Sequence, residues 1–301
     1  MKLLEKAALH WDQMAARPDD RLILRWWESP TLRKLVDENW WRATGAGNAG
    51  EYIRRRTGRD SLGLGMSIGC GTAEDEILLL KHGILDRLIL CDISNEQLDR
   101  AMIFAQEQYI DVNRIIRLNY VDLSKNYHEP LDLIYWRHSL HHMFDTRATI
   151  EWCRENLTAN GAIYCNDACP PNYMQWDETV LDWVELYRNS LPTDYLVSPF
   201  DRSTLMSSRL TPPGIEHWKA IDPTECADSA GIIPAIQDLA PKAHIAFLGG
   251  CIYALALEDI INNFDEKDEP MLRNAMRLDH FMAEAGMNFY FACVINRDDF
   301  L

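Results

Sequence analysis

The stretch Leu64-Gly65-Met66-Ser67-Ile68-Gly69-Cys70-Gly71-Thr72-Ala73-Glu74-Asp75-Glu76 decides the fold. An apolar run that ends in small residues and then becomes acidic is typical of a buried strand, a tight turn and the start of a helix. Gly69 and Gly71 have no Cβ, so the backbone can bend sharply there and approach a ligand closely. The stretch therefore predicts a turn that cradles a nucleotide-containing ligand.

Composition limits the class of protein. The chain has 301 residues, of which 47% are hydrophobic and 25% charged, enough for one large domain or a domain with an elaborate insertion. Its 30 Lys and Arg against 46 Asp and Glu leave a formal charge of −16, which would repel nucleic acid and an anionic membrane surface. The one basic cluster, Arg54-Arg55-Arg56 with Arg59, is interpreted as a solvated face. We expect neither nucleic acid nor a membrane as partner.

Cysteine usage and the N-terminus bear on the compartment. The eight cysteines form no C-x-x-C pair, and several lie in apolar runs, so they are interpreted as reduced core thiols. The first residues lack a sustained apolar region, and no stretch approaches the length of a membrane span. These features predict a cytoplasmic protein.

Strand and helix patterns alternate along the chain. After the first strand, further strands are predicted at residues 88–91, 114–120, 131–136, 161–167, 245–250 and 288–295. Among the predicted helices, one opens at Asp222 and runs toward Leu239, and another runs from Cys251 to Asn263. The fold class is α/β, with a doubly wound, mostly parallel sheet of seven strands. The predicted units are an N-terminal helical cap at 1–60, a cofactor-binding core at 61–168, a helical lid or insertion at 169–243 and a C-terminal completion of the sheet at 244–301.

Two further features concern the ligand. Asp92 ends the second strand at about the interval from Gly71 at which a Rossmann unit places a carboxylate against ribose hydroxyls. Ser94 then caps the next helix, with Gln97 three residues later. Glu74 stands where the dinucleotide fingerprint has Gly or Ala, so a pyrophosphate would meet a carboxylate there. This weakens the nicotinamide alternative.

The first stretch resembles motif I of the S-adenosylmethionine-dependent methyltransferases with a Rossmann-like fold, with Gly69, Gly71 and Ala73 at its three small positions. Ala73 replaces the third Gly, and Ser67 stands where many members have Asp or Glu, so the amino group of the cofactor needs another partner. Asp122 follows the third strand at the position whose Asp meets the adenine amino group in that family. The resemblance implies these cofactor-binding residues: Ser67, Gly69, Cys70, Gly71, Asp92, Ile93, Asp122, Leu123, Arg137 and His138.

The layout as a whole resembles bacterial methyltransferases encoded with polysaccharide or natural-product pathways. The matching pieces are Trp26-Trp27-Glu28-Ser29-Pro30, Ser67 to Gly71, Asp92-Ile93-Ser94, Leu140-His141-His142, Gln175-Trp176, Asp222-Pro223-Thr224-Glu225 and Gly249-Gly250. Two pieces depart from that family: Asp167-Ala168-Cys169-Pro170-Pro171 replaces Glu-Tyr-Val-Gly-Pro, and Asp228-Ser229 replaces an Arg-Ser pair.

Candidate catalytic residues follow the fourth and fifth strands. His141 and His142 are candidate bases. The resemblance favours His141, because the Leu-His-His junction recurs in that family and its first His is expected to project into the crevice while the second turns toward the following helix. Asp167 could hold the acceptor or cap the following loop. A metal site at His138, His141 and His142 is not expected, because adjacent side chains should diverge and no distant Cys or His completes a pattern.

The acceptor side is less defined. Trp26, Trp27, Tyr173, Gln175 and Trp176 are candidate substrate contacts, although core packing would explain the tryptophans as well. We expect O- or N-methylation of a small molecule or sugar-containing metabolite with S-adenosyl-L-methionine as cofactor. The alternatives are an NAD-dependent sugar-modifying enzyme, which Glu74 and the lack of a Tyr-x-x-x-Lys pair disfavour, and a catalytically silent cofactor-binding partner subunit. The oligomeric state stays open, a homodimer being compatible with the sequence.

Overall fold

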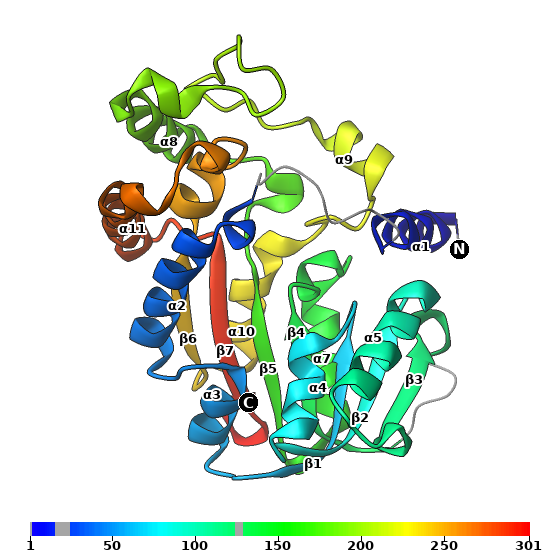
Figure 1. Cartoon of the computed structure of the whole chain (residues 1–301). Coiled ribbons are helices and arrows are strands. Elements are labelled where there is room, and N and C mark those ends of the chain that lie inside the picture. Colours follow the sequence, from blue (N-terminus) through cyan, green and yellow to red (C-terminus); the bar gives the residue numbers. More distant parts are fainter. Residues whose placement is uncertain (1, 16–24, 124–128) are drawn as a thin grey trace.

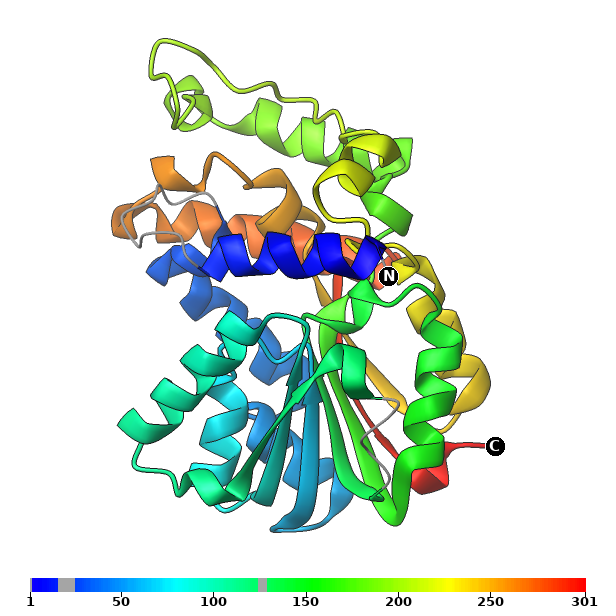
Figure 2. The ribbon, with the colours of Figure 1, turned by 90° about the vertical axis from the view of Figure 1, so that its right-hand side faces the viewer.

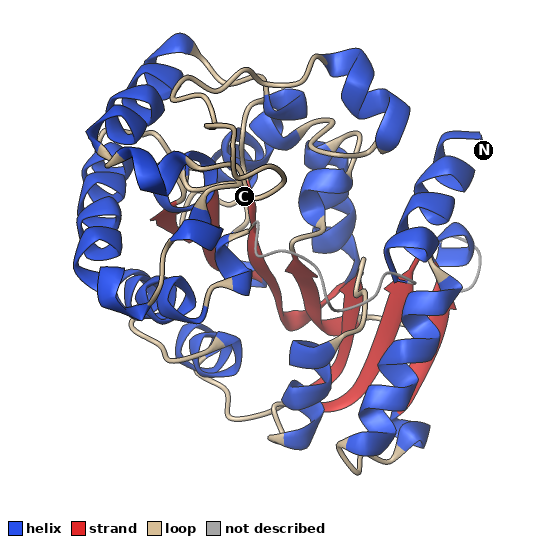
Figure 3. Ribbon diagram, turned by 45° about the horizontal axis from the view of Figure 1, so that its top comes forward, coloured by secondary structure: helices blue, strands red, loops and turns tan. Residues whose placement is uncertain are grey.

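Seven strands form one mixed sheet with helices on both faces (Figures 1 and 3). The computed structural model describes residues 2–15, 25–123 and 129–301. The strands are β1 (Leu62–Ile68), β2 (Leu85–Asp92), β3 (Ile115–Asn119), β4 (Leu131–Arg137), β5 (Leu157–Ala168), β6 (His244–Gly249) and β7 (Tyr290–Asn296). Their order is β3-β2-β1-β4-β5-β7-β6, and β7 runs antiparallel to both of its neighbours while the other pairs are parallel. The predicted α/β class and seven-stranded, mostly parallel sheet are confirmed.

Several helices begin at a Ser, Asn or Asp whose side chain accepts a hydrogen bond from a backbone N–H of the first turn. The helices are α1 (Lys2–Ala15), α2 (Pro30–Thr44), α3 (Ala49–Thr57), α4 (Glu74–Lys81), α5 (Asn95–Glu107), α7 (Thr146–Asn156), α8 (Glu178–Ser190), α9 (Ile215–Ile221), α10 (Ile232–Leu239) and α11 (Glu269–Glu284). The Ser94 side chain accepts from the N–H of Gln97, so the predicted cap of α5 is confirmed.

Alternate residues of each strand serve two separate cores, because successive side chains of a strand point to opposite faces. On β4, Leu133 and Tyr135 pack with the core beneath α2, α3, α4 and α5, whereas Ile134 and Trp136 pack with the core beneath α7 and α10. Burial on both faces explains why the strands read as continuous apolar runs.

The N-terminal residues divide into two parts. Helices α2 and α3 pack on one face of the sheet, against β6 and β7. Helix α1 lies instead across the edge where β1, β2 and β4 end, as Figure 2 shows, and contacts α5. This position makes α1 part of the candidate site described below.

Two predicted helices differ in the structure. The helix expected from Asp222 begins ten residues later, at Ile232, because Asp222 Oδ1 accepts hydrogen bonds from both N and Oγ1 of Thr224 (2.9 and 2.6 Å) and so closes a turn. The helix expected from Cys251 is a short π-helical turn, Cys251–Ala256. In the described ranges, no helix combines the length and apolarity needed to cross a bilayer.

Candidate functional site

The turn after β1 opens onto a cavity. Gly69 and Gly71 both have positive φ, +66° and +53°, which favours glycine. A Cβ on Gly69 would lie 2.6 Å from Cβ of Ser139, whereas nothing lies within 4 Å of the Cβ position of Gly71. The backbone therefore passes tightly under the β4 loop and leaves open space beside Gly71.

The cavity at this turn has a volume of about 460 Å³, within the range of small-molecule sites. We call it the cofactor cavity. Its walls come from α1, the β1–α4 turn, the end of β2 and the loop after β4. Of the predicted cofactor residues, it is lined by Gly69, Cys70, Gly71, Asp92, Ile93, Arg137 and His138. The lining by described residues includes Tyr120 but not Asp122 or Leu123, so adenine binding at Asp122 stays a prediction.

Asp92 joins the ends of β1 and β2. Its Oδ2 accepts from the N–H of Gly71 and its Oδ1 from the N–H of Ser94, both at 2.8 Å. The side chain is buried, and burial raises the pKa of Asp92. A carboxylate has about four acceptor sites, so both oxygens retain lone pairs for ligand hydroxyls.

Glu76 was not among the predicted site residues. It lies on α4, is 3% exposed, lines the cofactor cavity and accepts a hydrogen bond from Ser67 Oγ at 2.8 Å. Burial raises its pKa to about 7, and the charge of Arg137 partly opposes that shift. The sequence shows three carboxylates in the first turn of α4, Glu74, Asp75 and Glu76. It does not show which of them turns toward the cavity.

Gln97 and Trp11 were not predicted from the sequence as residues of the site either. Both line the cofactor cavity, and the buried Oε1 of Gln97 has no hydrogen-bond partner in the described part of the chain. The Trp11 ring meets the His142 ring edge to face, with centroids 5.4 Å apart. An unpaired acceptor on the wall is the kind of group that a bound ligand satisfies.

A second cavity, of about 390 Å³, adjoins the first. We call it the aromatic cavity, because Trp26, Trp40, Tyr164, Tyr253 and Tyr290 line it together with Asp37, Asn39 and Asn166. Arg137 and His138 line both cavities. His138 has a φ of +51°, an uncommon conformation for a non-glycine residue, and burial lowers its pKa to about 4.

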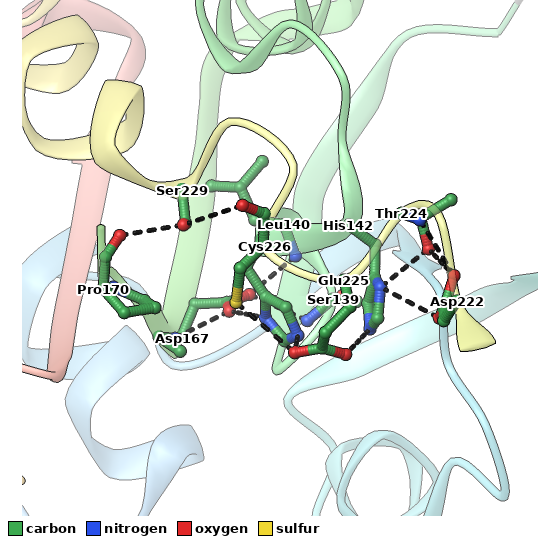
Figure 4. Close-up of polar contacts among 12 residues, drawn as sticks. Ser139, Leu140, His142, Asp167, Pro170, Asp222, Thr224, Glu225, Cys226 and Ser229 are labelled. Carbon is green, nitrogen blue, oxygen red and sulfur yellow. Dashed lines mark hydrogen bonds and ion pairs between the residues drawn. The ribbon is translucent and has the colours of Figure 1, made fainter. Parts of the chain in front are cut away.

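The histidine pair follows β4 in a 3₁₀ turn, Leu140–His142 (Figure 4). His141 Nδ1 lies 2.5 Å from Asp167 Oδ1, and Asp167 Oδ2 accepts from the N–H groups of Ser139 and Leu140 at 2.8 and 2.6 Å. Burial would lower the pKa of His141, but Asp167 outweighs it and raises the pKa to about 9. Asp167 thus fixes the loop and orients the imidazole.

His142 is held by a second set of hydrogen bonds, through Thr224 and Asp222. Its Nδ1 lies 2.9 Å from Thr224 Oγ1, and Thr224 Oγ1 lies 2.6 Å from Asp222 Oδ1. Burial and the neighbouring His141 lower the pKa of His142. His142 lines the cofactor cavity, whereas His141 is not part of its described lining, so the expectation that His141 projects into the crevice and His142 turns away is not what the structure shows.

Glu225 completes this cluster. Its carboxylate oxygens lie 3.8 Å from His141 Nε2 and 3.9 Å from His142 Nε2. The two imidazole rings lie side by side, 4.2 Å apart and tilted by 39°. The expectation that adjacent histidine side chains diverge is therefore wrong, and a carboxylate from the insertion takes the place of the distant Cys or His that was sought.

The predicted substrate residues do not gather at one site. Trp26 lines the aromatic cavity and donates from Nε1 to the Tyr290 hydroxyl at 3.4 Å. Trp27 is 45% exposed, and Gln175 Nε2 donates to the carbonyls of Tyr173 and Pro213. Trp176 packs against Phe289 in the core. Among the described residues, neither cavity is lined by Trp27, Tyr173, Gln175 or Trp176.

Comparison with known proteins identifies the central segment. Residues 66–163, from β1 to β5, match the family model of the methyltransferase domain. The chain carries a methyltransferase domain. The glycine turn, Asp92, His141 and His142 belong to this domain, whereas Thr224 and Glu225 come from the segment between β5 and β6 that follows it.

Solved structures of methyltransferases resemble this chain, one of them over its whole length. Geranyl diphosphate C-methyltransferase from Streptomyces coelicolor A3(2), in complex with Mg²⁺, geranyl diphosphate and S-adenosyl-L-homocysteine, is 13% identical with a TM-score of 0.50, covering 99% of each chain. The N-methyltransferase NodS from Bradyrhizobium japonicum WM9 is 17% identical with a TM-score of 0.37, covering 55% of this chain and 74% of its own. None of the curated proteins matches the chain.

Proposed function

We propose that this methyltransferase transfers the methyl group of S-adenosylmethionine to an oxygen or nitrogen of a small-molecule acceptor. The observation that carries the proposal is the junction between the two cavities, where Arg137 and His138 line both. One cavity suits the cofactor and the other the acceptor, so the two molecules would meet at this junction. A methyl transfer is an in-line displacement, for which alignment of the two reactants is the main requirement.

The residues of the cofactor cavity fit S-adenosylmethionine, which when bound supplies a methyl group on a sulfonium. Asp92 offers lone pairs to the ribose hydroxyls, and Glu76 offers a buried carboxylate to the amino group. Gln97 Oε1 is an acceptor that lacks a partner in the described structure. The open space beside Gly71 admits the ligand close to the backbone.

The aromatic cavity suits an acceptor with a compact ring and polar substituents. Trp26 and Tyr253 supply flat apolar surface, while Asp37 and Asn39 supply a carboxylate and an amide for hydroxyl or amino groups. The indole N–H of Trp40 is buried without a hydrogen-bond partner in the described chain, which points to a group that the acceptor provides. A sugar-containing metabolite meets these requirements.

An acceptor hydroxyl or ammonium also has to lose a proton. We propose that the pair His141 and His142 takes it, with His142, whose pKa is lowered, as the neutral imidazole that accepts the proton and Asp167 as a positioning residue that holds His141. The support is geometric: the pair leaves the carboxyl end of β4, and His142 reaches the wall of the cofactor cavity. Open α/β sheets bind their ligands at this kind of switch point.

The test is turnover. Purified protein is incubated with S-adenosylmethionine and a panel of hydroxylated or aminated ring compounds, and S-adenosylhomocysteine is measured. With an active acceptor, Trp40→Phe should lower kcat/KM for the acceptor by about tenfold, because one hydrogen bond is lost, without changing cofactor affinity. Trp41→Phe is the matched control, since Trp41 is 64% exposed. Cofactor binding without turnover across the panel would favour the silent-subunit alternative.

A further inference from the structure

The cluster after β4 holds more negative charge than a proton-accepting pair requires. Asp167, Asp222 and Glu225 surround the two imidazoles of His141 and His142. Within the described ranges, the ion pairs of these three carboxylates are with the histidines alone. Asp222 is 2% exposed, and its Oδ2 has no hydrogen-bond partner among the described residues. Asp167 is buried as well and Glu225 is partly buried, and carboxylates in such an excess favour a compensating cation.

The hydrogen bonds fix which nitrogen each imidazole presents. The Thr224 hydroxyl has one hydrogen and donates it to Asp222 Oδ1, so Thr224 Oγ1 accepts from Nδ1–H of His142. Asp167 accepts from Nδ1–H of His141 in the same way. Both Nε2 atoms are then directed at Glu225, and Figure 4 shows Glu225 facing His142. The oxygens of Glu225 are acceptors as well, so in the neutral form of each imidazole the Nε2 lone pair faces another acceptor, and a cation between them would satisfy both.

The spacing matches ligands on one metal ion. The Nε2-to-carboxylate distances of 3.8 and 3.9 Å are too long for hydrogen bonds, and the three candidate ligand atoms lie within 4.8 Å of one another. Tetrahedral ligands about 2.1 Å from a zinc ion lie roughly 3.4 Å apart, so small side-chain rotations would close the set. Two imidazoles with one carboxylate is a donor set that zinc enzymes use with an open fourth position.

We propose that His141, His142 and Glu225 bind a divalent transition-metal ion, of which Zn²⁺ best suits the donors, at the edge of the cofactor cavity. Each ligand already has an outer partner of the kind that orients metal ligands. Asp167 holds His141, Thr224 holds His142, and the Cys226 thiol lies 3.3 Å from Glu225 Oε1. Ring nitrogens disfavour Mg²⁺ and Ca²⁺, which prefer oxygen.

The role of the ion rests on the proposed function, although its binding does not. An acceptor hydroxyl on the open position would release its proton to solvent water, because a bound cation lowers the pKa of a coordinated hydroxyl. The alkoxide oxygen then forms the new C–O bond while the C–S bond of the sulfonium breaks and the sulfur keeps the electron pair. With the metal bound, the imidazoles act as metal ligands, so water and not a histidine accepts the proton.

The test measures metal binding directly. Chelator-stripped full-length protein is titrated with ZnCl₂ by calorimetry and with CoCl₂ by visible absorption. We expect one equivalent of Zn²⁺ and a cobalt spectrum of nitrogen and oxygen ligands, with no response to millimolar MgCl₂. Glu225→Gln should weaken binding at least tenfold, whereas Glu216→Gln should not, because Glu216 is a distant, exposed carboxylate.

Thr224→Val gives a second variant that leaves all three ligands in place. Loss of an outer partner typically weakens metal binding 10- to 100-fold, so an effect in this range supports the site. Circular dichroism without metal shows whether each variant is folded. Unchanged Zn²⁺ affinity in folded Glu225→Gln, or a thiolate-to-cobalt band, overturns the proposal. S-adenosylmethionine binding is titrated separately, and its failure would overturn the proposed function and leave the metal site standing.

Discussion

Ser67 Oγ donates a hydrogen bond of 2.8 Å to Glu76 Oε1, joining the end of β1 to the first turns of α4. Ser67 stands where many methyltransferases of this fold have an acidic residue. The structure supplies a carboxylate to the same place from the following helix, since Glu76 is buried and lines the cofactor cavity. The acid that motif I lacks is therefore present, nine residues later in the chain.

Glu76→Gln should weaken S-adenosylmethionine binding. The amide keeps the shape and the contact with Ser67 but removes the charge that faces the amino group, and a charge-assisted hydrogen bond contributes about 1.5–3 kcal/mol. We expect at least a tenfold higher Kd by calorimetry. Glu96→Gln, at an exposed position of α5, is the control. Equal affinity of wild type and Glu76→Gln would show that the amino group binds elsewhere.

The same residue predicts a pH dependence of stability. Burial raises the pKa of Glu76 from its ordinary value of 4.5 to about 7, with Arg137 opposing and Asp75 adding to the shift. The folded state therefore binds this proton more tightly than the unfolded state does. The resulting stabilisation is complete below pH 4.5 and is lost as the pH rises through 7.

Denaturant unfolding without cofactor, at pH 5 and pH 8, measures this effect. The stability gained by wild type at the lower pH should exceed that gained by Glu76→Gln by up to about 3 kcal/mol. The comparison between variants is needed because burial also raises the pKa of Asp279, to about 6, and that contribution cancels. Identical pH profiles for both proteins would contradict a shifted Glu76.

Asp92→Ala should weaken cofactor binding by tenfold or more and also destabilise the protein. The carboxylate accepts from the N–H groups of Gly71 and Ser94, so its loss frees the motif I turn as well as the ribose contacts. Asp92→Asn keeps one oxygen acceptor, so its cofactor affinity and its stability should both lie between those of wild type and Asp92→Ala. Asp86→Asn, at an exposed position of the same strand, is the control. Calorimetry that gives Asp92→Ala the wild-type Kd would remove Asp92 from the cofactor site.

The fold could be predicted largely from local pattern. Every strand was placed within a few residues, because strands buried on both faces leave continuous apolar runs between turn residues. The exceptions have local causes. Asp222 and Thr224 form side-chain hydrogen bonds that compete with helix formation, which delays α10 to Ile232.

The site could be predicted where one segment builds it and not where distant segments meet. Gly69, Gly71 and Asp92 lie in the turns that the pattern identified, and all three line the cofactor cavity. Glu225 is 83 residues beyond His142, and Trp11 reaches the cavity from α1, across the sheet edge. Such contacts depend on tertiary packing, which periodicity along the chain does not encode.

Trp11→Ala tests whether α1 takes part in cofactor binding. Trp11 lines the cofactor cavity and packs edge to face on His142, and the neighbouring Asp12 accepts a hydrogen bond from Ser94 Oγ beside Asp92. Removing the indole opens the cavity wall to water, so we expect about a tenfold higher Kd for S-adenosylmethionine, mainly through faster dissociation. Leu9→Ala is the matched control on the same helix, because Leu9 is 58% exposed. Stopped-flow displacement measures the dissociation rate. An equal effect of both substitutions would mean that α1 matters through its helicity, and no effect of either would mean that it lies outside the binding site in solution.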